Sequence, residues 1–146
     1  GPDGVLREAL GAKVFGDKEA LARLESIVHP AVAGKREAFL IEHSGAPVVV
    51  FDIPLLFEKG GAEVVDRVVV VSAPAEAQRK RVLARPGMTE EKFAHILSLQ
   101  VPDAEKRERA DHVIDTGTSL ERTEEAVVAL AGQLREAAAA RRPIGP

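Results

Sequence analysis

The chain of 146 residues contains no cysteine, tryptophan or tyrosine and only five phenylalanines. Without cysteine, disulfide bonds, thiolate metal sites and cysteine nucleophiles are excluded, which leaves histidine and carboxylate chemistry. The formal charge of −3 and the scarcity of aromatic rings argue against a nucleic-acid surface, which needs a basic field or a stacking platform. We therefore expect no nucleic-acid partner and only local binding of phosphate groups.

Long apolar runs are missing as well. No stretch approaches the roughly 18 consecutive apolar residues of a membrane helix, and the N-terminus lacks a signal-peptide layout. Hydrophobic residues make up 45% of the chain and charged residues 29%, a globular composition. These features predict a soluble, cytoplasmic protein with no membrane partner. Because the chain starts with Gly1 and not methionine, we expect it to be a portion of a longer protein.

Helical apolar spacing dominates the first third of the sequence. Asp17 is placed to cap a helix that ends at His29 and Pro30. Pro30 can open a second helix, which would run to about His43. Residues 5–45 are therefore predicted to form a helical layer.

The pattern then changes to short runs of β-branched residues. Segments 47–51 and 66–72 are rich in consecutive valines, and a shorter strand is expected at 112–115. Runs that are apolar at successive positions are typical of parallel strands covered on both faces.

Three further segments have helical spacing: 74–85, 89–100 and 118–139. The last of them begins with Thr118 and Glu121, which match a capping box. The alternation of strands and helices predicts an α/β fold with at least three parallel strands.

Asp52 follows the first predicted strand and precedes a loop with large apolar side chains at 55–57. Ligands of open parallel sheets collect at the carboxyl ends of strands, and an aspartate of this kind orients Mg²⁺ in P-loop NTPases. The alternative is an ordinary turn or cap residue. The apolar side chains either pack under a neighbouring layer or line a pocket.

Two other features carry candidate chemistry. His29 lies where two helices are expected to meet, so its ring either points into a cleft or caps helix carbonyls. Four cations fall within 79–85, and on a helix Arg81 and Arg85 share a face that suits a phosphate chain. The alternative is a solvated basic face. Because a proline and a glycine follow at 86–87, the cluster is similar to a mobile lid.

Five separated motifs together resemble one family, the dephospho-CoA kinases. They are LESIVHP at 24–30, DIPLLFE at 52–58, Gln78 with Arg81 and Arg85, Gln100, and ADHVIDTG at 110–117. The resemblance implies the fold of a P-loop kinase, with three αβα layers around a parallel sheet, a helical substrate-binding layer and a lid. It also implies transfer of the ATP γ-phosphoryl group to the 3′-hydroxyl of dephospho-CoA, the last step of coenzyme A synthesis, with ATP and Mg²⁺ as cofactors.

The resemblance also implies roles for individual residues. Arg85 would be a catalytic lid cation, and Arg81 would join it in binding ATP phosphates. Thr116 and Gly117 fall where the family places a loop near the adenine, although the family more often has asparagine at 116. No metal ligand is assigned. The residues implied to bind dephospho-CoA are His29, Pro30, Asp52, Leu55, Phe57 and Glu58.

In this interpretation residues 1–146 are a single, partial kinase domain. Its parts are the helical substrate-binding layer at 5–45, the sheet with flanking helices at 46–85 and 110–140, the lid region at 86–109, and a disordered tail at 141–146. Two alternatives stay open: a non-catalytic module that binds coenzyme A or a nucleotide, and a P-loop kinase for another small metabolite or a nucleoside monophosphate.

The family begins with a strand, a Gly-x-x-x-x-Gly-Lys-Ser/Thr loop and an Asp-x-Asp segment, and this sequence has none of them. Because phosphoryl transfer depends on positioning and charge neutralisation, we expect the chain alone to be inactive. The missing strand would be central in the sheet. Its neighbours would expose unpaired backbone groups, which predicts instability or self-association through those edges.

Overall fold

The structure is a computed structural model that describes residues 4–141. The chain divides into two compact units, Gly1–Val49 and Val50–Pro146, and each is described by itself. The domain boundaries predicted from the sequence, including the helical layer at 5–45, stay a prediction. Within the predicted tail, residues 142–146 lie outside the described residues, whereas Arg141 is not disordered but ends a helix.

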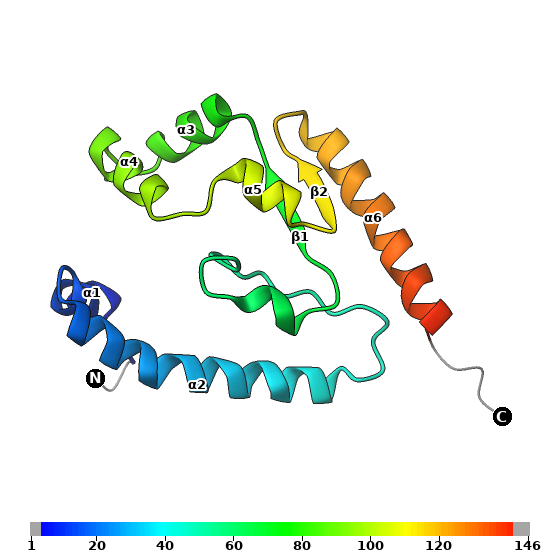
Figure 1. Cartoon of the computed structure of the whole chain (residues 1–146), viewed down its shortest axis with the longest axis horizontal. Helices are drawn as coiled ribbons and strands as arrows, with labels where there is room; N and C mark the ends of the chain where they lie inside the picture. The colour runs from blue at the N-terminus through cyan, green and yellow to red at the C-terminus, as the bar shows by residue number, and fades with distance from the viewer. Residues whose placement is uncertain (1–3, 142–146) are drawn as a thin grey trace. The chain divides into compact units, whose positions relative to one another are not determined.

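The first unit consists of α1 (Arg7–Val14) and α2 (Lys18–Glu42), which contact each other (Figure 1). The predicted cap of α2 is confirmed. Oδ1 of Asp17 accepts hydrogen bonds from the backbone N–H groups of Glu19 at 3.0 Å and Ala20 at 2.9 Å. These two bonds satisfy donors that the first helical turn leaves without an intrahelical partner.

The helix break predicted at His29 and Pro30 is wrong, because Pro30 lies inside α2. Figure 1 shows α2 as one unbroken helix. Proline removes one backbone hydrogen bond, but about three turns of helix flank it on each side, and helix formation is cooperative. His29 therefore does not cap a helix end. The C-cap of α2 is His43, whose Nδ1 lies 2.9 Å from the carbonyl oxygen of Phe39 in the last turn.

Replacing Pro30 by alanine is expected to raise the free energy of unfolding of the protein. A proline inside a helix costs about 3 kcal/mol relative to alanine, and its restriction of the unfolded chain returns up to about 1 kcal/mol, so we expect a gain of about 2 kcal/mol. Urea unfolding followed by far-UV circular dichroism measures it. The matched control is Gly34→Ala in the same helix, where an added Cβ meets nothing within 4 Å. A gain no larger than that of the control would contradict the prediction.

The second unit is an α/β arrangement around two parallel strands, which confirms the predicted fold class (Figure 1). Strand β1 pairs with β2 in a register that runs from Val69 opposite His112 to Ser72 opposite Asp115. Helix α5 contacts β1, α6 contacts β2, and α3 contacts α4. In chain order the elements are η1 (Gly61–Val64), β1 (Val69–Ser72), α3 (Ala75–Leu83), α4 (Glu90–Ser98), α5 (Asp103–Glu108), β2 (His112–Asp115) and α6 (Leu120–Arg141).

The strand predicted at 47–51 is not formed, so the described residues hold two strands and not the three expected. A strand is stabilised by backbone hydrogen bonds to a neighbouring strand, and this segment pairs with neither β1 nor β2. Valine-rich composition favours extended backbone but does not supply the partner.

The prediction that the strands are buried on both faces is also wrong for β1. Val70 is 8% exposed and Ser72 5%, whereas Val69 is 38% exposed and Val71 64%. Alternate residues of a strand point to opposite faces, and Ser72 is hydrogen-bonded to α5. The covered face of β1 is therefore the one under α5.

The helices of this unit follow the sequence prediction with two exceptions. Helix α5 was missed, because six residues are too few to show helical periodicity. The capping box of Thr118 and Glu121 is wrong by one residue: Oγ of Ser119 accepts the hydrogen bond from the N–H of Arg122 at 3.3 Å. Threonine and serine are both good caps, so the sequence does not choose between neighbours. None of the helices within residues 4–141 is long and apolar enough to cross a membrane.

Candidate functional site at the carboxyl end of the sheet

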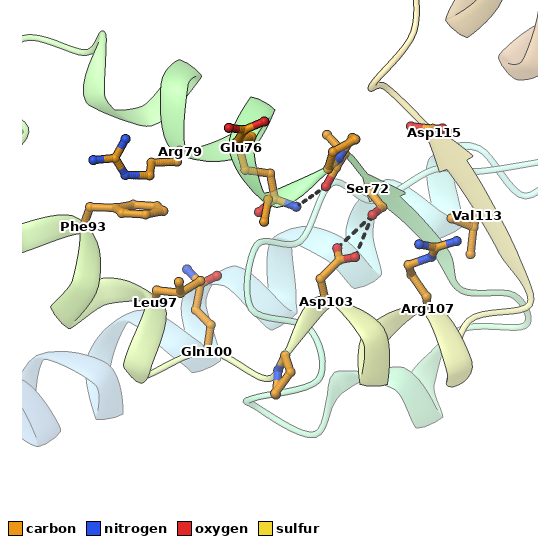
Figure 2. Close-up of a pocket in the computed structure, with 15 residues that line it drawn as sticks. Ser72, Glu76, Arg79, Phe93, Leu97, Gln100, Asp103, Arg107, Val113 and Asp115 are labelled. Atoms are coloured by element: carbon orange, nitrogen blue, oxygen red, sulfur yellow. Dashed lines mark hydrogen bonds between the residues drawn. The ribbon is translucent and has the colours of Figure 1, made fainter. Parts of the chain in front are cut away.

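A cavity of about 780 Å³ lies at the carboxyl end of β1 (Figure 2). Open parallel sheets bind ligands at this position, although the sequence placed the ligand at Asp52, which does not line the cavity. Helices α3, α4 and α5 supply its walls, with Glu76, Gln78 and Arg79 from α3, Phe93 and Leu97 from α4, and Asp103 and Arg107 from α5.

The buried hydroxyl of Ser72 forms hydrogen bonds at the floor of the cavity. Oγ of Ser72 lies 2.9 and 2.8 Å from the two carboxylate oxygens of Asp103, the first residue of α5, and Figure 2 shows the two side chains pointing toward each other. Nε2 of Gln78 donates to the carbonyl oxygen of Ala73 at 2.8 Å. Both bonds join a helix to the end of β1, so they fix α3 and α5 around the cavity.

Two guanidinium groups stand on opposite sides of this floor. Figure 2 shows Arg79 beside the ring of Phe93, and Arg107 near Val113. Arg79 is paired with Glu90, whereas Arg107 has no ion pair among residues 4–141. Guanidinium groups beside apolar and aromatic side chains suit a ligand that combines an anionic group with a flat ring. The sequence interpretation assigned neither arginine. Its only signal was the position of Arg79 in the predicted basic cluster.

Arg81 and Thr116, both expected to bind ATP, are in direct contact. Arg81 Nη1 donates to Thr116 Oγ1 at 3.2 Å, and Nη2 donates to the carbonyl oxygen of Thr116 at 2.6 Å. The N–H and hydroxyl of Thr116 also donate to the carbonyl oxygen of Ser72, at 2.7 and 2.9 Å. The turn after β2 is thereby tied to α3 and to the end of β1.

Gly117 completes this turn because no larger residue fits. An added Cβ would lie 2.3 Å from Cδ of Pro74 and 3.0 Å from Oδ1 of Asp115. The backbone N–H of Gly117 donates to the same Oδ1 at 2.7 Å. The glycine therefore allows the turn to approach the start of α3 closely.

Arg85 lies in the turn between α3 and α4, outside the cavity lining. Its side chain is exposed and has no ion pair in the described part of the chain. The turn contains Gly87 with φ of 75°, and Nζ of Lys92 donates to the carbonyl oxygen of Gly87 at 2.9 Å. Arg85 thus lies at the connection of two contacting helices, directly before the region at 86–109 that the sequence predicts as the lid.

The residues expected to bind dephospho-CoA lie outside the cavity lining. His29 and Pro30 are exposed in the middle of α2, in the other unit. Asp52 is exposed in an irregular loop, and Leu55 in the same loop is 41% exposed and has φ of 64°. Left-handed backbone is uncommon for leucine and marks local strain. The ring of Phe57 lies under the guanidinium group of Arg109, 4.5 Å from centroid to carbon.

Glu58 is bound by protein groups and is 11% exposed. Its Oε1 lies 2.8 Å from Nζ of Lys106 and accepts the N–H of Val101 at 2.9 Å. Burial alone would raise the pKa of Glu58, but the hydrogen bonds from Lys106 and Val101 outweigh it and lower the pKa below its ordinary value of 4.5. The carboxylate is therefore ionised at neutral pH.

This lowered pKa makes part of the stability depend on pH. A carboxyl group with a depressed pKa in the folded state stabilises the protein above its unfolded pKa, and this contribution is lost as the pH falls through the folded value. We expect Glu58→Gln to lower the free energy of unfolding by about 1 kcal/mol at neutral pH. Urea unfolding at several pH values should show this difference shrinking below about pH 4.5. A difference that stays constant down to about pH 3 would contradict the assignment.

No group of three or more histidine, aspartate or glutamate side chains within residues 4–141 could hold a metal ion.

A cavity at the carboxyl end of a parallel sheet flanked by helices is typical of α/β proteins that bind ligands at strand ends. The comparisons with known proteins identify the family. The family model of dephospho-CoA kinase matches residues 2–122, and the chain belongs to the dephospho-CoA kinase family.

Two relatives illustrate the similarity in sequence. The dephospho-CoA kinase of Novosphingobium aromaticivorans is 71% identical over 136 residues, which cover 93% of this chain and 68% of that protein. The dephospho-CoA kinase of Mesorhizobium japonicum is 59% identical over 136 residues, which cover 91% of this chain and 69% of that protein. The chain thus spans about two thirds of the length of these relatives.

Solved structures confirm the fold. TT1252 from Thermus thermophilus matches with a TM-score of 0.71 and 40% identity, over 88% of this chain and 67% of that one. Dephospho-CoA kinase from Campylobacter jejuni matches with a TM-score of 0.66 and 28% identity, over 91% of this chain and 67% of that one. The resemblance drawn from the five motifs is confirmed, as is the P-loop kinase fold.

Proposed function

We propose that this chain forms the acceptor side and the lid of an enzyme that transfers the γ-phosphoryl group of ATP to the 3′-hydroxyl of dephospho-CoA. The single observation that carries the proposal is the contact between Arg81 and Thr116 at the carboxyl end of the sheet. It joins the lid helix to the turn after β2, and the resemblance placed both residues at ATP. With Gly117 they form a site for the nucleotide, next to the cavity.

Charge neutralisation is the task of the lid in this proposal. The γ-phosphoryl group carries its charge on oxygens that guanidinium groups bind well. Arg85 stands at the connection of α3 and α4, exposed and without an ion pair among residues 4–141. It is therefore available to a phosphate, whereas Arg81 orients the turn beside the nucleotide. ATP arrives with Mg²⁺ bound to its phosphates, which supplies further neutralisation.

The resemblance assigns dephospho-CoA binding to His29 and Pro30 of α2 and to Asp52, Leu55, Phe57 and Glu58 of the loop after it. His29→Ala in the full-length gene product that contains this chain is expected to raise the KM for dephospho-CoA about tenfold, with kcat changed less. Steady-state kinetics at saturating ATP measures both constants. The exposed His95→Ala serves as the control. An unchanged KM would remove His29 from the acceptor site.

An acceptor panel tests the substrate. The full-length gene product is supplied with ATP and, separately, dephospho-CoA, a nucleoside monophosphate and pantetheine 4′-phosphate, and ADP release is followed. We expect dephospho-CoA to be used with the highest kcat/KM. A preference for a nucleoside monophosphate would support a kinase for another acceptor and overturn this assignment.

We also propose that the chain of 146 residues, taken alone, binds ligand without turnover, because its sequence contains no Gly-x-x-x-x-Gly-Lys-Ser/Thr loop. Its two-stranded sheet has two open edges within the described residues, which favours self-association. Calorimetry with ATP and with dephospho-CoA tests the binding, and sedimentation tests the association. Formation of coenzyme A by the isolated chain would contradict this proposal. A cytoplasmic location fits a soluble metabolite enzyme.

A further inference from the structure

Three contacts join the loop at 55–58 to the segment at 101–109, which lies more than 40 residues further along the chain. Lys106 and the N–H of Val101 both bind Oε1 of Glu58, at 2.8 and 2.9 Å. The guanidinium group of Arg109 covers the ring of Phe57 at 4.5 Å. We call these three contacts the loop clamp.

The ion pair of the loop clamp is more enclosed than the pair of Arg141 and Asp66 at the surface. Its side chains are 20% exposed for Lys106 and 11% for Glu58, whereas Arg141 and Asp66 are 61% and 87% exposed. Ion pairs at the surface contribute little, but removing one partner from an enclosed pair leaves a desolvated charge. Oε2 of Glu58 is already buried without a hydrogen-bond partner in the described part of the protein. Loss of Lys106 would therefore force the loop to move so that Glu58 can reach water.

Helix α5 connects the loop clamp to the cavity. Asp103 at its start binds the buried hydroxyl of Ser72, and Lys106 is three residues further on, so both anchors lie close together on one short helix. The same helix follows directly after α4 of the lid. A displacement of α5 therefore acts on the cavity floor and on the loop together.

The loop itself needs external support. It contains Leu55 in left-handed backbone, and its own hydrogen bonds are local turns in which the N–H groups of Lys59, Gly60 and Gly61 donate to the carbonyl oxygens of Leu55, Phe57 and Leu56. A non-glycine residue in this conformation costs about 1–3 kcal/mol and persists only where its surroundings hold it. The loop clamp supplies that restraint.

We propose that Lys106 is a positioning residue, which through Glu58 holds the loop at 55–58 in the shape that receives the acceptor and ties it to the lid through α5. This inference rests on the proposed function, because that function assigns the loop to dephospho-CoA. Lys106 touches neither substrate in this scheme. Its effect reaches the acceptor through the loop.

The kinetic test uses Lys106→Met in the full-length gene product, with Arg141→Met as the matched control from an exposed ion pair. We expect Lys106→Met to raise the KM for dephospho-CoA about tenfold while the KM for ATP changes less than about twofold. Lys106→Arg should restore most of the acceptor KM because it keeps the charge. The double variant Glu58→Gln with Lys106→Met should be no worse than Lys106→Met alone, since it leaves no unpaired charge. Equal changes in both KM values, or none, would overturn the positioning role.

Hydrogen exchange provides a readout that does not depend on the substrate. In Lys106→Met we expect the backbone N–H groups of residues 59–61 to exchange about tenfold faster, while those of β1 and β2 keep their rates. Unchanged exchange at 59–61 would overturn the loop clamp itself. If exchange rises there but the enzyme prefers another acceptor, the loop clamp is supported and the proposed substrate is wrong. If Lys106→Met does not fold, the double variant, which has no stranded charge, is measured in its place.

Discussion

Gly117→Ala is expected to lower the free energy of unfolding by about 3 kcal/mol, a large part of the stability of a small domain. The new Cβ would lie 2.3 Å from Cδ of Pro74, and a proline ring at the start of α3 cannot rotate away as a flexible side chain can. The turn must move, and the hydrogen bond from the N–H of Gly117 to Asp115 is strained or lost with it. Chemical denaturation of the purified variant measures the effect.

Gly132→Ala is the matched control for this substitution. Gly132 lies inside α6, and a Cβ at this position meets nothing within 4 Å. Alanine in a helix interior is favoured over glycine by about 0.5–1 kcal/mol, so this variant should be more stable than the wild type. Opposite signs for the two replacements would show that the effect at Gly117 comes from the close approach. A loss below about 1 kcal/mol at Gly117 would contradict the packing of the turn against Pro74.

Arg85→Ala is expected to lower kcat of the full-length gene product about 10²–10³-fold with little change in the KM for dephospho-CoA. A cation that acts on the transferring phosphoryl group stabilises the transition state more than the bound substrates. Rates at saturating concentrations of both substrates give kcat directly.

Lys80→Ala controls for the loss of a positive charge from the same basic segment. Lys80 is exposed on α3 and does not line the cavity, so its kcat should stay within about twofold of the wild type. Similar losses in the two variants would point to a general electrostatic effect of the basic segment. A kcat of Arg85→Ala close to that of the wild type would remove Arg85 from the chemistry.

Local patterns in the sequence predicted the elements that local physics determines. Asp17 was predicted to cap a helix, and the structure shows it as the N-cap of α2 with the expected hydrogen bonds. Segment 112–115 was predicted as a short strand, and β2 has the same bounds. The motif at 110–117 also led to the family, which the comparisons confirmed.

Features that depend on distant partners could not be predicted in the same way. The valines before Asp52 favour extended backbone, but no neighbouring strand completes them in the described residues. Glu58 pairs with Lys106, and Ser72 pairs with Asp103. These residues are far apart in the sequence, so their spacing does not predict the contacts. The helix was predicted to end at Pro30 because proline removes a backbone hydrogen bond. The sequence does not show how far the helical turns on both sides of Pro30 stabilise the helix in spite of that loss.

The destination of the transferred phosphoryl group tests the central claim most directly. The full-length gene product is incubated with dephospho-CoA and ATP labelled in its γ-phosphate, and the labelled product is then treated with a 3′-nucleotidase. We predict that the label enters coenzyme A and is released by this treatment, because it sits on the 3′-hydroxyl of the ribose. Label that remains in ATP or inorganic phosphate, or enters the product at another position, would contradict the assignment of this chain to the acceptor side and lid of a dephospho-CoA phosphorylating enzyme.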